Sequence, residues 1–135
     1  AATSLTCKRP WPRLSCAKTA AMDAKTLLDQ FNAAFNRHDV DGMMDLMTPD
    51  CVFENTDPPP SGERFAGQSA VRQFWVDFFE AAPTARIDIE ELFICGERAV
   101  QQWVYHWSAD GFVRGVDVFR LRDEKIAEKL SYVKG

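Results

Sequence analysis

The residue with the clearest chemical potential is Asp117, an acid within the mostly apolar first half of the stretch 111–133. Side chains along a strand alternate between two faces, and from 113 to 121 both faces are largely apolar, which predicts a strand buried on both sides. A carboxyl group in such surroundings, if it has no charged partner, can donate a proton or a hydrogen bond. Asp117 is therefore the first candidate for acid–base chemistry.

Other residues capable of chemistry are few. The chain has two His, at 38 and 106, and four Cys, at 7, 16, 51 and 95, with no CxxC pair. Zinc sites need clustered Cys and His ligands, so neither a metal nor another cofactor is expected. We expect reduced cysteines in a cytoplasmic protein, with paired secretory disulfides as the alternative.

Composition limits the class of protein. A chain of 135 residues with 46% hydrophobic residues, ten Phe and four Trp is long enough for one domain with a sizeable core. Residues 1–21 hold four basic residues and no acid, so the net charge of −4 for the whole chain becomes −8 for the remainder. Because phosphate binding needs Lys and Arg, nucleic acid is not an expected partner. No apolar run approaches transmembrane length, so no membrane association is expected either.

The first 21 residues differ from the rest. They show no hydrophobic periodicity and lack the apolar centre of a secretory signal, although their basic, Ser/Thr-bearing composition loosely resembles a transit peptide. We expect a dispensable or expression-derived leader at 1–21, with a targeting segment as the alternative, ahead of a single domain at 22–135.

The elements that position Asp117 follow from periodicity. Apolar spacings of three and four predict helices over 23–35, over 40–47 and from 68 or 69 to about 81. Alternation and turn residues predict strands at 51–55, 85–94, 99–107, 112–121 and 126–133, with a long loop at 56–67. Helices ahead of an antiparallel meander indicate an α+β domain with the helices packed on one face of the sheet.

Three stretches, FNRHDVDGMMDLMTPDCVFEN, GERFAGQSAVRQFW and RGVDVFRLRDEKIAEKLSYV, resemble the nuclear transport factor 2-like α+β barrel superfamily, in its SnoaL-like and ketosteroid-isomerase-like branch. The resemblance implies a cone-shaped barrel whose strongly curved antiparallel sheet wraps around helices on its concave face. It also implies a deep apolar pocket and a homodimer through the convex face. This fold hosts isomerases, polyketide cyclases, epoxide hydrolases, dehydratases and binding proteins, so function depends on the site.

The length of the turn at 108–111 decides which residues share a face. An even number of loop residues places Asp117 with Gln102, Val104 and His106. The expected dimer face is then formed by Trp103, Tyr105, Trp107, Arg114, Val116 and Val118. An odd number of loop residues would exchange the two faces.

The catalytic residues that the resemblance implies are only partly present in this sequence. Of the ketosteroid isomerase residues, Asp117 is retained, whereas the Tyr falls on Phe31 and the general-base Asp on Asn55. Of the catalytic residues of limonene-type epoxide hydrolases, the Asn is retained as Asn55. Their Tyr falls on Phe53, and one of their Asp residues falls on Ser131. The SnoaL-like cyclases, which close a ring by an aldol step, fit best, with Asp117 and His106 as the acid–base pair. The alternative for His106 is a half-buried strand-end histidine bound to a carbonyl.

The direction of Lys129 separates two roles for Asp117. The same alignment turns Lys129 and Ser131 inward, where an Asp117–Lys129 ion pair would be a fixed polar anchor. If Lys129 instead faced solvent, Asp117 would be free to donate a proton.

These inferences predict one pocket and an enzyme. The candidate catalytic residues are Asp117, His106 and Asn55. The predicted lining is Phe31, Phe35, Phe53, Trp75, Phe79, Val104, Phe119, Lys129 and Ser131. We expect an isomerase- or cyclase-type enzyme that uses acid–base chemistry on an apolar, oxygen-bearing, medium-sized compound. The alternatives are a non-catalytic binding protein, or an interaction module if its own side chains fill the pocket.

Overall fold

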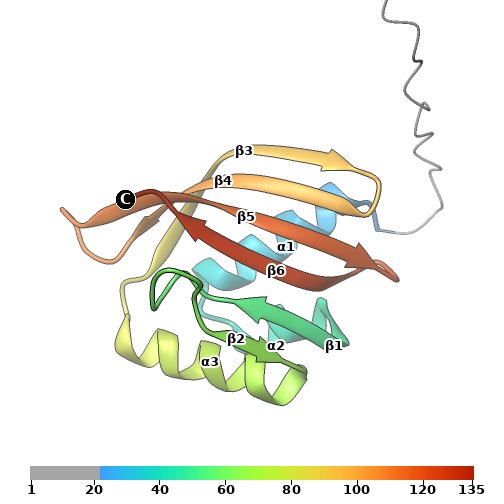
Figure 1. Ribbon diagram of the computed structural model, residues 1–135, viewed down its shortest axis with the longest axis horizontal. Helices are drawn as coiled ribbons and strands as arrows, with labels where there is room; N and C mark the ends of the chain where they lie inside the picture. Colours follow the sequence, from blue (N-terminus) through green and yellow to red (C-terminus); the bar gives the residue numbers. More distant parts are fainter. Residues whose placement is uncertain (1–21) are drawn as a thin grey trace, which may run out of the picture.

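The computed structural model describes residues 22–135, and the predicted leader at 1–21 lies outside the described residues (Figure 1). The helices are α1 (Ala24–Asn36), α2 (Val40–Asp45) and α3 (Gln68–Ala81). The strands are β1 (Met47–Glu54), β2 (Arg64–Ala66), β3 (Arg86–Cys95), β4 (Arg98–His106), β5 (Phe112–Arg122) and β6 (Lys125–Val133). The three helices and five strands predicted from periodicity are confirmed. The sequence pattern missed β2, which lies inside the predicted loop, and it placed the start of β1 four residues too late.

Helix α1 begins after a capping residue, and both α1 and α3 bury predicted apolar residues. The side chain of Asp23 accepts a hydrogen bond from the Thr26 amide, which satisfies a backbone donor at the start of α1. The buried face of α1 includes Phe31 and Phe35, and that of α3 includes Trp75 and Phe79. Burial of each such aromatic side chain contributes about 1.5–3 kcal/mol to folding.

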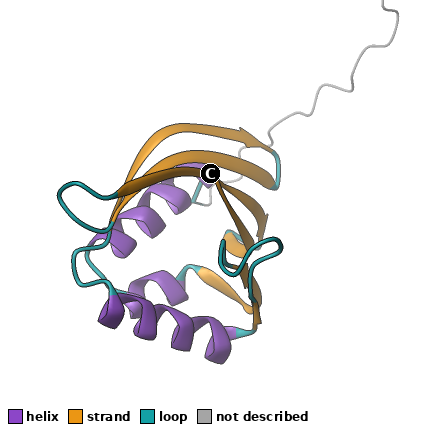
Figure 2. Ribbon diagram, turned by 60° about the vertical axis from the view of Figure 1, so that its left-hand side comes forward, coloured by secondary structure: helices purple, strands orange, loops and turns teal. Residues whose placement is uncertain are grey.

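The sheet has the strand order β2-β1-β6-β5-β4-β3 and curves around the helices (Figure 2). The α+β class and the helices on the concave face are therefore confirmed. Two details are corrected: β1 runs parallel to β6, so the sheet is mixed, and its edge strands β2 and β3 do not pair, so the barrel is not closed. The helices cover the concave side between these two edges.

The register of β4 and β5 overturns the predicted assignment of faces. His106 pairs with Phe112, which leaves five residues, 107–111, in the connection. This number is odd, and because side chains alternate with a period of two, the faces are exchanged. Asp117 lies opposite Gln101, and Gly115 lies opposite Trp103, so all four residues share one face of the sheet. Asp117, Gln101 and Trp103 are buried, and Gln101 bonds Asn32 of α1, so this face is the one toward the helices.

Two groups of predictions were therefore wrong in their placement. Val104 and His106 lie on the outer face of the sheet and not with Asp117. Trp103 and Tyr105 lie on the inner face and not on the expected dimer face. Three residues of that expected dimer face remain on the outer face of β5: Arg114, Val116 and Val118.

The interior beneath the sheet holds the remaining predicted pocket residues. All six predicted aromatic lining residues are buried: Phe31, Phe35, Phe53, Trp75, Phe79 and Phe119. Several of them touch one another, since the ring centroids of Phe53 and Trp75 are 4.8 Å apart and those of Phe35 and Phe79 are 5.2 Å apart. The predicted pocket lining is thus part of the hydrophobic core, and a ligand space within it stays a prediction.

Candidate functional site

Asp117 is fully buried, and three donors reach its carboxylate. Oδ1 accepts hydrogen bonds from Lys129 Nζ at 3.1 Å and from Ser131 Oγ at 2.6 Å. Oδ2 accepts from Gln101 Nε2 at 2.9 Å. Lys129 therefore points inward, and of the two alternatives for Asp117 the structure shows the ion-paired one.

Strand register brings these groups together. Gln101 of β4 and Ser131 of β6 both lie directly opposite Asp117 of β5, one on each side. Lys129 lies opposite Phe119, two positions along the same face, within reach of the carboxylate. Because side chains on one face repeat every two residues, inner-facing positions on three adjacent strands converge on one acid.

A helix completes this group. Asn32 of α1 donates from Nδ2 to Gln101 Oε1 at 2.8 Å, and Gln101 Nε2 donates to Asn32 Oδ1 at 3.1 Å. We call Asn32, Gln101, Asp117, Lys129 and Ser131 the interior polar cluster. The sequence prediction missed Asn32 and Gln101, although a signal was present, since Asn32 is a polar residue adjoining the apolar stripe of α1.

Lys129 carries the buried positive charge of the cluster, with its side chain 9% exposed. Its Nζ donates to Asp117 and to Ser131 Oγ, the latter at 2.8 Å. It also lies 4.8 Å from the ring centroid of Phe53 and 5.6 Å from that of Trp75. An ammonium has three donors, so one N–H remains for the aromatic side of the site, where the cation–π contacts stabilise it.

Two further donors lie in this interior without acceptors. Within the described part of the chain, the indole N–H groups of Trp75 and Trp103 are buried and have no hydrogen-bond partner. A buried donor without an acceptor typically costs about 1–3 kcal/mol. The indole of Trp103 lies against Gly115, so it borders the cluster on the same face of the sheet. An oxygen-bearing ligand that reached these donors would satisfy them.

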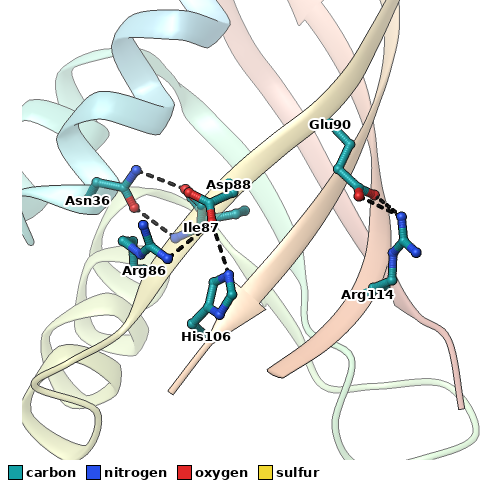
Figure 3. Close-up of polar contacts among 7 residues, drawn as sticks. All are labelled: Asn36, Arg86, Ile87, Asp88, Glu90, His106 and Arg114. Carbon is teal, nitrogen blue, oxygen red and sulfur yellow. Dashed lines mark hydrogen bonds and ion pairs between the residues drawn. The ribbon is translucent and has the colours of Figure 1, made fainter. Parts of the chain in front are cut away.

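His106 lies on the other side of the sheet. Its Nε2 is 3.0 Å from Asp88 Oδ2, and Arg86 binds the same oxygen at 3.2 Å (Figure 3). Nearby, Arg114 binds both oxygens of Glu90 at 2.5 and 2.6 Å. The odd connection between β4 and β5 is the reason, since it turns His106 outward. Asp117 and His106 therefore do not form the predicted acid–base pair.

Asn55 also lies apart from the interior polar cluster. It lines an open hollow of about 620 Å³ beside β2 and α3. The hollow is lined by Asn55, Glu63, Phe65, Ala70, Gln73, Phe74, Asp77 and Phe78. Phe53 contacts both Phe74 of this lining, at 4.8 Å between centroids, and Lys129 of the cluster. The rings of Phe53 and Phe74, which we call the aromatic layer, thus lie between the open hollow and the interior polar cluster.

Titratable groups elsewhere in the domain behave as their surroundings predict. Burial raises the pKa of the Cys51 thiol above its ordinary value and does the same for the Tyr105 hydroxyl. Hydrogen bonding to Arg122 lowers the pKa of the exposed Asp50.

Within residues 22–135, no three His, Cys, Asp or Glu side chains are grouped so as to hold a metal ion. None of the helices described is long and apolar enough to cross a membrane.

Comparison with known proteins gives a matching family and several similar solved structures. The sequence model of the SnoaL-like domain family matches residues 28–129 of this chain. A nuclear transport factor 2-like protein of unknown function from Mesorhizobium loti is 42% identical, with a TM-score of 0.72 over 82% of this chain and 90% of that one. Among curated proteins, none matches the chain.

Two more distant solved structures share the fold. A protein named as a candidate polyketide cyclase, from Sinorhizobium meliloti, is 21% identical, with a TM-score of 0.68 over 78% of this chain and 92% of that one. A protein named as a candidate ketosteroid isomerase, from Kribbella flavida, is 15% identical, with a TM-score of 0.68 over 81% of this chain and 76% of that one. At these identities the likeness shows the fold alone.

Proposed function

The chain belongs to the SnoaL-like domain family, and from this membership and its buried cation we propose that it is a small-molecule enzyme of the isomerase or cyclase type. The substrate is an apolar compound that carries a carbonyl or similar oxygen. Family membership supports the broad class, because distant structural relatives are named for cyclase and isomerase activities.

The supporting observation is the ammonium of Lys129. It is held by Asp117 and Ser131 and faces the rings of Phe53 and Trp75. Removing a proton from carbon next to a carbonyl places negative charge on the carbonyl oxygen, and a preorganised buried donor stabilises that charge in the transition state. Lys129 fits this role, and the unpaired indole of Trp75 supplies a second donor nearby.

Asp117 takes a different role from the one expected of an isolated acid. Both of its oxygens are engaged, and one of its donors is the ammonium of Lys129. In this proposal Asp117 is a positioning residue that orients Lys129, and the proton acceptor is water or a group of the substrate. A ligand reaches Lys129 by displacing part of the aromatic layer around Phe53 and Phe74, which separates the cluster from the open hollow.

A second function, ligand binding without turnover, is favoured by a separate observation. Asp117 is the one carboxylate in the interior polar cluster, and it is already paired. Asn55, where the related isomerases have their general base, cannot accept a proton at working pH. A binding protein would use Lys129 as an anchor for the ligand oxygen and would leave the ligand unchanged.

A ligand search tests both functions. A library of apolar ketones, esters and lactones is screened by thermal shift against the wild type, Lys129→Gln and Asp117→Asn, and each hit is then checked by mass spectrometry for conversion. Turnover in the wild type that Lys129→Gln abolishes, while binding survives, supports the enzyme. Saturable binding with no conversion supports the binding protein. Turnover that is unchanged in Lys129→Gln would overturn the role given to this residue.

The outer face of the sheet supports the expected assembly. We propose a homodimer through this convex face, using Val116, Val118 and Leu130 of β5 and β6 together with the exposed Tyr132. These residues are apolar or aromatic and lie side by side, and Arg114 adds the kind of side chain that is enriched at interfaces.

We also propose that the protein is cytoplasmic, where the free thiols of Cys51 and Cys95 stay reduced.

A further inference from the structure

The open hollow beside α3 is a separate place at which a ligand could bind. The short strand β2 lies next to α3 (Figure 1). The lining residues of the hollow come from β2, from α3 and from the loop after β1. Its volume of about 620 Å³ falls within the range of small-molecule sites. Three rings, two amides, two carboxylates and one Ala form its lining, which includes no Lys, Arg or His.

The floor of the hollow is aromatic and is held in place from behind. The ring centroid of Phe74 is 4.9 Å from that of Phe65 and 5.8 Å from that of Phe78. Phe74 and Phe78 are four residues apart on α3, so they lie on one helix face, and Ala70 leaves space one turn earlier. Phe53 and Trp75 pack against Phe74 at 4.8 and 4.9 Å and support the floor. All three floor rings are partly exposed, which leaves ring surface for a ligand.

The rim of the hollow is negatively charged. Gln73 donates to Asp77 Oδ1 at 2.9 Å, which orients the carboxylate. The second oxygen of Asp77 has no hydrogen-bond partner among the described residues. Glu63 makes no ion pair with any residue that the structure describes. The neighbouring basic side chains form ion pairs with other carboxylates. Arg64 pairs with Glu54 and Glu128, and Arg72 pairs with Asp41. Within residues 22–135, the two rim carboxylates are therefore not neutralised by a basic side chain.

We propose that this hollow binds a small organic cation, a quaternary ammonium or amine with an apolar body. The positive charge lies over the faces of Phe65, Phe74 and Phe78, which attract cations, and close to the carboxylates of Glu63 and Asp77. Charge complementarity favours this occupant over a neutral or anionic one. The site is distinct from the one next to Lys129, because the rings of Phe53 and Phe74 lie between the two. A cation bound in the hollow would stand on the route proposed above for a ligand that reaches Lys129.

The test compares a cation with its neutral isostere. Choline and 3,3-dimethyl-1-butanol have nearly the same shape, and each is titrated at low salt into the isotopically labelled full chain and followed by amide NMR shifts. We expect choline to shift amides of β2 and the second half of α3 and to bind about fivefold more tightly than the alcohol. Equal affinities for the two probes, or shifts confined to other segments, would overturn the proposal.

Variants separate a built site from general attraction to an acidic domain. Asp77→Asn and Phe74→Leu should each weaken choline binding about threefold to fivefold, and the exposed Asp77 keeps the test informative if Phe74→Leu fails to fold. The matched control is Asp45→Asn, which makes the same charge change in a different hollow, lined also by Met44, Met47 and Lys125. Unchanged binding in Asp45→Asn supports the site. A loss equal to that of Asp77→Asn would show diffuse charge attraction only and would overturn the proposal.

Discussion

The ammonium of Lys129 lies 3.1 Å from Oδ1 of Asp117, and both residues are buried beneath the sheet. Taking two charges out of water is costly, and their attraction repays this cost only when the remaining donors and acceptors are satisfied. Here Ser131, Gln101 and Asn32 provide those partners, so the pair is part of a network that joins three strands to α1.

Removing one member of this pair should be strongly destabilising. Lys129→Met leaves the Asp117 charge buried without its cation and should lower the free energy of unfolding by about 3–5 kcal/mol, measured by urea denaturation. The double variant Lys129→Met/Asp117→Leu should recover much of this loss, because no unpaired charge remains. The control is Lys25→Met, since Lys25 pairs with Asp29 at an exposed site and should matter little. A loss for Lys129→Met no larger than that for Lys25→Met would contradict the structure.

The close approach of Trp103 to Gly115 should make a side chain at position 115 destabilising. A Cβ added there would lie 2.5 Å from the Trp103 ring and would also meet the backbone oxygen of Tyr132. Gly115→Ala should therefore lower the free energy of unfolding by about 1–3 kcal/mol. Gly135→Ala is the control, because a Cβ there would lie more than 4 Å from every described residue other than its chain neighbour.

Relieving only half of this clash should restore only part of the stability. Trp103→Leu combined with Gly115→Ala removes the contact with the ring but not the contact with the Tyr132 backbone. Thermal denaturation of the single and double variants measures the coupling. Equal melting temperatures for Gly115→Ala and the wild type would show that the register of β4 and β5 differs from the one described.

Cys51 should make stability fall at high pH. Burial raises the pKa of its thiol above the ordinary value of 9.0, so the unfolded chain loses this proton at a lower pH than the folded one does. The contribution is complete below pH 9.0 and is lost as the pH rises toward the pKa of the folded state. From about pH 8 to pH 10.5, the free energy of unfolding should fall more steeply for the wild type than for Cys51→Ala. Cys95→Ala, at an exposed thiol, should follow the wild type.

A charge on the outer face of the sheet should separate the proposed dimer. Val118→Glu places a carboxylate beside Val116 and Leu130, where burial in an interface would be unfavourable. Light scattering after size-exclusion chromatography should give a dimer mass for the wild type and a monomer mass for Val118→Glu. Val76→Glu makes the same change at an exposed apolar position of α3 and should leave the dimer intact. A monomeric wild type would refute the assembly.

The sequence alone was sufficient to predict the three helices, five of the six strands and the buried acid. Apolar residues three and four apart in α1 and α3, and alternating ones in β5, are local patterns that burial imposes on a chain. For the same reason the aromatic core residues and the inward position of Asp117 could be predicted correctly. The family was recognised from three continuous stretches of the chain, and the match over residues 28–129 confirms it.

The tertiary structure decided which residues meet Asp117. His106 was assigned to the wrong face because one residue in the connection 107–111 changes the side of every residue in β4 relative to β5, and that count depends on where pairing ends. The hydrogen bonds between Asn32 and Gln101 join residues 69 positions apart, beyond the reach of any local pattern. The direction of Lys129 was open for the same reason: a long side chain turns toward a buried acid only once the strands are paired, which local periodicity does not encode.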